Sequence, residues 1–252
     1  MQPQVTLVGA GPGDPDLISL KGVKALKNAD VVLYDALVNP LLLNHCSPSV
    51  KKVYVGKRAG KASYTQEEIN QLMVSHALSH GHVVRLKGGD PFIFGRGKEE
   101  LEYVQFFNIP TEVVLGISSV NLPGYYGIPL TKRGINQSFW VVTATNKEGN
   151  LTDDVRLAAQ SSATVVLLMG LKKLEEIVTL FKENEKGDLP IAIISKGSTV
   201  EGKVIFGTID TIVEKKRKVG VTSPAMIIIG EVVASHEQFN EWREETAAYF
   251  PA

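Results

Sequence analysis

Short, β-branched apolar runs alternate with stretches of helical character, and this alternation limits the possible folds more than any other feature of the chain. The first half carries five such runs, at 5–8, 31–34, 53–55, 83–86 and 113–115, with helices predicted at 17–28, 65–79 and 98–107. Thr65 and Glu68 form a predicted capping box at the start of the second helix. Strands that are separated by helices usually pair in parallel, with the helices packed on the faces of the sheet. The pattern therefore predicts an α/β fold.

The alternation breaks near residues 129–137 and then resumes. The second series has strands predicted at 138–144, 164–168, 190–195, 203–207 and 225–230, and helices at 152–160, 172–183 and 209–218. Glu201-Gly202-Lys203 is typical of a hairpin turn, so this second sheet is expected to be mixed. We therefore expect two α/β domains, residues 1–131 and 132–252, with both glycine-rich loops in the first.

Composition excludes several classes of protein. The single cysteine, Cys46, rules out an intrachain disulfide framework and a multi-thiolate zinc site, which favours a reducing, cytoplasmic setting. No apolar run approaches the ~18 residues of a membrane span, and the first residues lack the pattern of a signal peptide. Lys and Arg total 27 against 27 Asp and Glu, a balance that disfavours a general nucleic-acid binder. An enzyme with neither a membrane nor a nucleic-acid partner is expected.

Positive charge is concentrated in one segment. Residues 51–98 carry nine basic and three acidic side chains. This segment either attracts an anionic ligand or forms a solvated basic surface, and charge by itself favours neither. His76, His80 and His82 lie in the same region without an evident acidic partner, so no metal site is expected.

The first predicted strand runs into a glycine-rich loop, Gly9-Ala10-Gly11-Pro12-Gly13-Asp14-Pro15. A dinucleotide-binding loop is one interpretation, and Asp35, after the second strand, would supply the acid that holds a ribose. However, Asp14 occupies the third glycine position, where a pyrophosphate would lie, and the two prolines remove amide donors. The alternative is a tight turn that needs glycine for its geometry only.

A second glycine-rich loop, Lys87 to Gly97, follows the fourth predicted strand. Ligands of open α/β sheets bind at the carboxyl ends of strands, which is where this loop lies. Asp90 is suited to hold a ligand hydroxyl or ammonium group, and Arg96 and Lys98 are suited to hold carboxylates. Asp35 has two interpretations as well, because it either accepts a proton in catalysis or caps the next helix.

Six motifs occur in an order that resembles the uroporphyrinogen-III C-methyltransferases of the tetrapyrrole methylase family. They are Val8 to Pro15, Tyr34-Asp35-Ala36-Leu37-Val38, Val55-Gly56-Lys57-Arg58, Arg85 to Gly97, Gly127-Ile128-Pro129-Leu130-Thr131 and Met169-Gly170-Leu171. The resemblance covers about residues 5–233 and ends with Ser223-Pro224-Ala225 and Gly230-Glu231-Val232-Val233.

The resemblance implies two α/β domains, an active site in the cleft between them, bound S-adenosyl-L-methionine and a homodimer. The cofactor contacts that it implies are Pro12, Gly88, Gly89, Asp90, Ile93, Ser118, Ser119, Met169, Gly197 and Ala225. It also implies Asp35 as the proton acceptor and Lys57 as the proton donor. The residues that it implies for holding the tetrapyrrole are Arg96, Glu99 and Arg133.

The implied reaction is methylation of uroporphyrinogen III at C2 and then C7, giving precorrin-2 for siroheme or cobalamin synthesis and S-adenosyl-L-homocysteine as the second product. Ala36 and Lys132 depart from the arginine and histidine that are usual in the family, which affects the expected substrate contacts. The alternatives are a methylase of a later precorrin, a dinucleotide-dependent oxidoreductase and a non-catalytic tetrapyrrole-binding protein.

Overall fold

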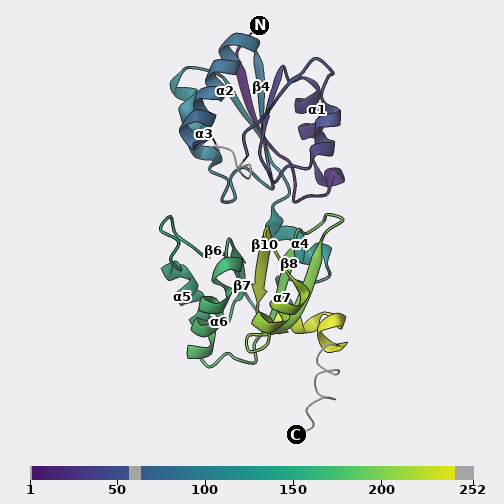
Figure 1. The fold of residues 1–252 in the computed structure, drawn as a ribbon, viewed down its shortest axis with the longest axis vertical. Helices are drawn as coiled ribbons and strands as arrows, with labels where there is room; N and C mark the ends of the chain where they lie inside the picture. The colour runs from purple at the N-terminus through teal and green to yellow at the C-terminus, as the bar shows by residue number, and fades with distance from the viewer. Residues whose placement is uncertain (1, 57–63, 242–252) are drawn as a thin grey trace. The chain divides into compact units, whose positions relative to one another are not determined.

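The chain divides into two compact units, Met1–Ser119 and Val120–Ala252. The computed structural model describes residues 2–56 and 64–241, and both units are drawn in Figure 1. The boundary expected near residue 131 lies inside the second unit, because Leu122 and Ile128 are buried in that unit's core.

The first unit is built on a sheet of five parallel strands. These are β1 (Gln4–Gly9), β2 (Val31–Tyr34), β3 (Lys51–Tyr54), β4 (His82–Lys87) and β5 (Thr111–Val114), in the order β3-β2-β4-β1-β5. The predicted parallel α/β sheet is thereby confirmed. Its strand order differs from the 3-2-1-4-5-6 order of dinucleotide-binding folds, because β4 separates β1 from β2.

Helices cover both faces of this sheet (Figure 1). Helix α1 (Leu20–Lys27) and the 3-10 segment Pro40–His45 pack on one face, with Val8, Val32 and Leu86 in the core between them. Helices α2 (Gln66–His80) and α3 (Gly97–Phe106) pack on the other face, and the core there includes Leu7, Leu33, Met73 and Val104. Successive strand residues point to opposite faces, which produces two separate cores in one unit.

The chain leaves the adjacent strands β1 and β4 in opposite directions. After β1 it continues into α1 on one face, and after β4 it continues into α3 on the other. Ligands of open α/β sheets usually bind at such a switch point, at the carboxyl ends of the strands. The two glycine-rich loops are the loops that diverge here.

The second unit has a mixed sheet, as predicted. Its strands are β6 (Phe139–Thr143), β7 (Thr164–Leu168), β8 (Pro190–Ser195), β9 (Lys203–Thr208) and β10 (Ala225–Ile229), in the order β6-β7-β10-β8-β9. Only β6 and β7 pair in parallel, and β8 and β9 form the expected hairpin.

Two layers cover this second sheet. Helices α5 (Asp153–Gln160), α6 (Leu174–Glu183) and α7 (Ile212–Val219) cover one face, with Ile193 and Phe181 in the core. The short helix α4 (Leu122–Tyr125) and the 3-10 segment Glu231–Ser235 cover the other face, together with Phe239. None of the helices that the structure describes has the length and apolar character needed to cross a membrane.

Candidate functional site

Backbone segments pack closely where β1, β4 and β5 end. Gly11 and Gly89 exchange two backbone hydrogen bonds, of 3.3 and 2.7 Å, which tie the two glycine-rich loops together. A Cβ on Gly9 would lie 2.4 Å from the Gly116 backbone, and one on Gly116 would lie 2.2 Å from the Gly89 carbonyl oxygen. Packing therefore requires glycine at both Gly9 and Gly116. For Gly9, this agrees with the interpretation that the first loop needs glycine for its geometry.

Gly89 has different surroundings from these packed glycines. Its φ is +68°, and a Cβ there would meet only the Ser119 amide nitrogen, at 3.8 Å. The neighbouring Gly88, in contrast, packs against Leu37, whose Cβ would lie 2.5 Å from an added Cβ. The side of Gly89 on which a Cβ would lie is therefore open, so a ligand can approach the main chain there.

Asp90 joins the second glycine-rich loop to the segment that follows β5. Its Oδ1 accepts a hydrogen bond from the Phe92 amide at 2.8 Å, and its Oδ2 accepts one from the Gly116 amide at 3.0 Å. The residue is 8% exposed. Both carboxylate oxygens are therefore engaged by the main chain, and Asp90 shapes the loop as well as lying beside the open space at Gly89.

The rest of this loop is apolar and exposed, and it ends in an ion pair. Phe92, Ile93 and Phe94 are all exposed. Arg96 adopts a left-handed conformation at the start of α3, and its guanidinium donates to both carboxylate oxygens of Glu99, with Nε 3.1 and 3.0 Å from them. The structure thus pairs two of the residues implied for substrate binding with each other, at an exposed position.

Asp35 lies directly after β2 and does not cap a helix. Its Oδ1 accepts a hydrogen bond from the Leu37 amide at 3.1 Å, which forms a local turn, and the next helical segment begins later, with Asn39 as its cap. The helix-cap interpretation of Asp35 is therefore wrong. Its Oδ2 lies 3.5 Å from Nη2 of Arg85, and a quarter of its side chain is exposed. Lys57 lies outside the described residues.

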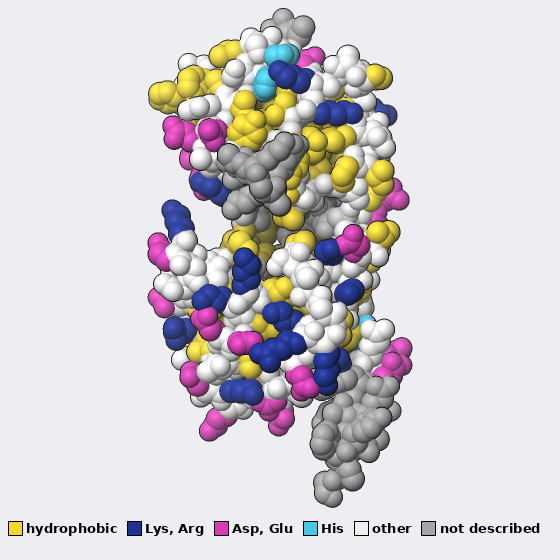
Figure 2. All heavy atoms as spheres, viewed as in Figure 1, with side chains coloured by type: hydrophobic (Ala, Val, Ile, Leu, Met, Phe, Trp, Pro, Cys, Tyr) yellow, Lys and Arg dark blue, Asp and Glu magenta, His cyan; other side chains and the backbone are white. Residues whose placement is uncertain are grey.

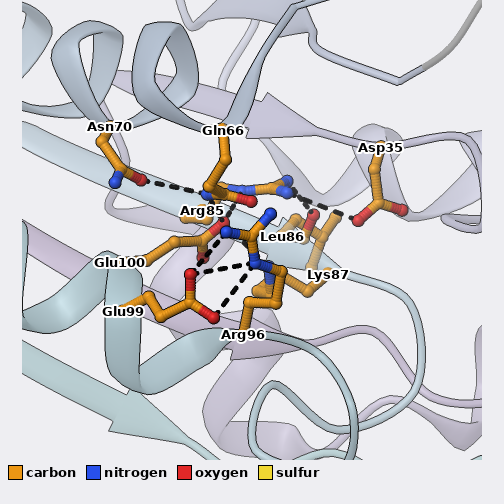
Figure 3. Close-up of polar contacts among 9 residues, drawn as sticks. All are labelled: Asp35, Gln66, Asn70, Arg85, Leu86, Lys87, Arg96, Glu99 and Glu100. Atoms are coloured by element: carbon orange, nitrogen blue, oxygen red, sulfur yellow. Dashed lines mark hydrogen bonds and ion pairs between the residues drawn. The ribbon is translucent and has the colours of Figure 1, made fainter. Parts of the chain in front are cut away.

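A buried cluster of charged side chains lies beside Asp35 (Figure 3). Glu100, on α3, is fully buried, and its Oε1 accepts from Arg85 Nε at 3.3 Å, Lys87 Nζ at 2.9 Å and Gln66 Nε2 at 3.0 Å. Burial lowers the pKa of Lys87, and Arg85 adds to this effect. Sequence reasoning missed this cluster, although charges at alternating positions of a buried strand are a signal for it.

The implied residues of the second unit gather at one edge of its sheet. Met169 follows the end of β7 and Gly197 follows the end of β8. Strand β10 runs antiparallel to both, with Ala225 opposite Ser195, so it begins at this same edge. Ala225 therefore lies at the same edge as Met169 and Gly197 because of the direction of β10, although it is distant from Met169 in sequence.

Backbone strain marks the same edge. Met169, Lys196 and Ser198 all have left-handed φ angles, of +58°, +47° and +55°. Such conformations are costly for residues with a Cβ and cluster at functional sites. Met169 is also 56% exposed, so it does not fill the core as a methionine at a strand end usually does.

The remaining implied residues divide between the carboxyl edge of the first sheet and the opposite edge of the second sheet. Arg133 precedes β6, in a segment where Asn136 donates to Thr164 Oγ1 at the start of β7, whereas Met169 follows the end of β7. Pro12, Ser118 and Ser119 follow β1 and β5 in the first unit and are half-buried, while Arg133, in the second unit, is exposed. Within the described part of the chain, no three or more His, Cys, Asp and Glu side chains converge as metal ligands do.

These features define an α/β protein with glycine-rich loops at the switch point of a parallel sheet and a strained strand-end loop in a second, mixed sheet. Over residues 4–213 the chain matches the family described as Tetrapyrrole (Corrin/Porphyrin) Methylases. The chain belongs to this family, which confirms the resemblance noted from its motifs.

Relatives and solved structures agree with this assignment. A uroporphyrinogen-III C-methyltransferase of Methanocaldococcus jannaschii is 48% identical over 236 residues, which are 92% of this chain and 98% of that protein. A siroheme synthase of Acinetobacter baylyi is 44% identical over 95% of this chain, which spans only 52% of that longer protein. The uroporphyrin-III C-methyl transferase of Thermus thermophilus, solved with S-adenyl homocysteine, is 39% identical with a TM-score of 0.79, covering 92% of this chain and 99% of that one.

Proposed function

We propose that this protein transfers methyl groups from S-adenosyl-L-methionine to C2 and C7 of uroporphyrinogen III, giving precorrin-2 and S-adenosyl-L-homocysteine. The observation that carries the proposal is the 48% identity over nearly the whole length of a uroporphyrinogen-III C-methyltransferase. The product would serve siroheme or cobalamin synthesis. The strand order of the first sheet argues against the alternative of a dinucleotide-dependent oxidoreductase.

The loops at both sheet edges suit the methyl donor. The open backbone at Gly89 leaves room for a ligand, and the acidic Asp90 beside it is compatible with a sulfonium cation, whereas it would repel a pyrophosphate. Backbone and side-chain groups of Pro12, Gly88, Ile93, Ser118 and Ser119 would hold the donor in the first unit. In the second unit, Met169, Gly197 and Ala225 would contact it.

The substrate carries carboxylates, and we propose that Arg96 and Arg133 bind them. Arg133 is exposed, and Arg96 is exposed with its guanidinium held by Glu99. A charged hydrogen bond from arginine to carboxylate contributes ~1.5–3 kcal/mol. Loss of either arginine should weaken uroporphyrinogen binding and leave S-adenosylhomocysteine binding intact.

Proton transfer would complete each methylation. The sulfonium methyl bonds to a ring carbon, S-adenosylhomocysteine leaves with the electron pair of the broken bond, and the cationic ring then loses a proton. Asp35 is the proposed acceptor of this proton, because it is partly exposed at the carboxyl edge of the first sheet. Lys57 is proposed as a proton donor to the tetrapyrrole, as the resemblance implies. We also propose that the enzyme acts as a homodimer in the cytoplasm, bound to neither membrane nor nucleic acid.

The test is incubation of the purified protein with S-adenosyl-L-methionine and uroporphyrinogen III without oxygen. We expect a product that carries two added methyl groups and two S-adenosylhomocysteine molecules released per tetrapyrrole. Tight binding of uroporphyrinogen without turnover would support a carrier instead. Turnover only with an already methylated precorrin would support a methylase of a later step. Sedimentation velocity would test the dimer separately.

The role of Asp35 has its own test. Asp35→Asn keeps the size of the side chain and its acceptor for the Leu37 amide but removes the base. Turnover should fall by ~10²–10⁴, with the affinity for S-adenosylhomocysteine nearly unchanged. A variant that keeps most of the wild-type turnover would contradict this role.

A further inference from the structure

Arg85, Lys87 and Glu100 are buried charged groups in a layer that is mostly apolar. Arg85 and Lys87 alternate with Leu86 along β4, so they point to the sheet face that α2 and α3 cover. Glu100 meets them from the first turns of α3 (Figure 3). Arg85 is 3% exposed, Lys87 is 5% exposed and Glu100 is fully buried.

Stability alone does not account for this cluster. Removing charges from water costs several kcal/mol per ion, and apolar residues of similar volume usually serve as well or better. The cluster is also incompletely satisfied, since Glu100 Oε2 is buried with no hydrogen-bond partner among the described residues. A buried charged group whose desolvation is not fully compensated points to a role in the site that it adjoins.

The guanidinium of Arg85 reaches two carboxylates at once. Its Nε donates to Glu100 Oε1, its Nη1 donates to the Leu86 carbonyl oxygen at 3.1 Å, and its Nη2 faces Asp35 Oδ2 at 3.5 Å. Lys87 supplies a second positive charge to Glu100, so Glu100 anchors Arg85 without neutralising the charge that Asp35 faces. Two hydrogen bonds therefore hold the planar guanidinium, and its Nη2 is directed toward Asp35.

Asp35 is in turn held at both of its oxygens. The Leu37 amide fixes Oδ1, and Arg85 approaches Oδ2. The register of the sheet explains this contact, because Leu33 pairs with Arg85 and Asp35 lies two residues further along the same face. One edge of the carboxylate is left toward solvent, since the side chain is a quarter exposed.

We propose that Arg85, anchored by Glu100 and Lys87, is a positioning residue that orients the Asp35 carboxylate toward the substrate. This inference rests on the proposed role of Asp35 as the proton acceptor. Arg85 itself does not touch the substrate and acts through Asp35. Misplacement of a reacting group by about 1 Å can reduce a rate by about 100-fold, so the contribution of such a device is measurable.

A double-mutant cycle on kcat tests the proposal. The variants are Asp35→Asn, Arg85→Met and the two together, in the full-length protein with S-adenosyl-L-methionine and uroporphyrinogen III. We expect Arg85→Met to lower kcat by up to about 100-fold, with little change in KM. In the Asp35→Asn background the same substitution should lower kcat by less than about twofold, because the group that Arg85 orients is gone.

Arg217→Met is the matched control. It also removes an arginine from an ion pair, with Glu175 at 2.6 Å, but this pair is exposed and belongs to the second unit. It should leave kcat unchanged. Should Arg85→Met fail to fold, Arg85→Lys replaces it in the cycle, because lysine keeps the charge but cannot span Asp35 and Glu100.

Three results would overturn the proposal, and they are distinguishable. If the losses from Asp35→Asn and Arg85→Met multiply in the double variant, Arg85 acts independently of Asp35 and has a structural role. If Asp35→Asn retains the wild-type kcat, the proton-acceptor role itself is wrong, and the positioning role is wrong with it. A kcat that Arg85→Met leaves unchanged would also exclude positioning.

Discussion

Gly89 and Gly116 follow β4 and β5, two strands of one sheet with β1 between them, yet a side chain at each would meet different surroundings. Gly116 is closed in by backbone atoms, whereas Gly89 faces open space. Asp90, beside Gly89, is tied to the main chain through both oxygens. Glycines at the same edge of the sheet thus either hold the loops together or leave room for a ligand.

Gly89→Ala should weaken cofactor binding beyond its effect on folding. Gly220→Ala is a matched control, because Gly220 has a φ of +69° against +68° at Gly89, and a Cβ there would meet nothing within 4 Å. Both variants carry similar backbone strain, about 1–2 kcal/mol. Calorimetry should show that Gly89→Ala alone raises the Kd for S-adenosylhomocysteine by roughly tenfold or more. A tenfold rise is equivalent to about 1.4 kcal/mol. Equal affinity in the two variants would remove Gly89 from the binding site.

His76 should make the protein less stable in mild acid. Its ring is nearly buried on α2, and desolvation, with Lys51 and His80 nearby, lowers its pKa. In the unfolded chain this histidine binds a proton at about pH 6.5, whereas in the folded protein it does so only at lower pH. The free energy of unfolding therefore falls as the pH decreases below about 6.5.

The substitution His76→Leu should remove this pH dependence. Chemical denaturation at about pH 7.5 and about pH 5.5 would show a smaller loss of stability for His76→Leu than for the wild type. Parallel losses in the two proteins would assign the acid sensitivity to other groups.

The first turn of helix α2 contains both a capping box and a residue that binds the buried charged cluster. Thr65 and Glu68 form the predicted capping box, with Thr65 Oγ1 accepting from the Glu68 amide at 3.2 Å and the Glu68 carboxylate accepting from the Thr65 amide at 2.6 Å. In the first turn, Gln66 donates to Glu100. The start of this helix therefore helps to hold the cluster that faces Asp35.

Removal of the cap should destabilise the protein modestly. Thr65→Ala is expected to reduce the free energy of unfolding by about 1 kcal/mol, because one amide at the start of α2 loses its acceptor. Thr65→Ser keeps the hydroxyl and should stay close to the wild type in urea denaturation. A loss in Thr65→Ser as large as in Thr65→Ala would assign the effect to the threonine methyl group.

The ion pairs of helix α7 are exposed, in contrast to the buried cluster around Glu100. Lys218 pairs with Glu214 at 2.8 Å and Arg217 pairs with Glu175, and all four side chains are more than two-thirds exposed. On the face drawn in Figure 2, Lys and Arg lie among Asp and Glu over the second unit. The cations of α7 lie in its last turn, where the helix dipole favours them.

At the scale of the whole molecule, each unit encloses its own apolar cores. The clusters around Met73 and Leu26 draw only on the first unit, and those around Phe181 and Phe206 draw only on the second. Separate cores allow the two units to lose structure separately.

Phe181→Ala should therefore destabilise the second unit selectively. Phe181 is almost completely buried, and its truncation costs about 3–5 kcal/mol. Amide hydrogen exchange should accelerate in β7, β8 and β10 but not in β1 and β4, while Met73→Ala should produce the reverse pattern. Acceleration in both units after either substitution would show that they unfold together.

The sequence by itself determined the elements and the ends of the strands. Alternation of β-branched runs with helical stretches reflects backbone preferences that act over a few residues, so it located the strands, the Thr65 cap and the β8–β9 hairpin. Because ligands of α/β sheets bind at strand ends, it also located both glycine-rich loops. The extent of the second unit depends on distant contacts, since Leu122 and Ile128 are buried against strands much further along the chain.

Only the tertiary structure decided which strand ends meet. Insertion of β4 between β2 and β1 brings Arg85 to Asp35, and the packing of α3 on that face brings in Glu100. In the second unit, the antiparallel direction of β10 places Ala225 at the edge where Met169 lies. Strand order and direction result from the burial of apolar faces between distant segments, and local sequence patterns carry no record of that pairing.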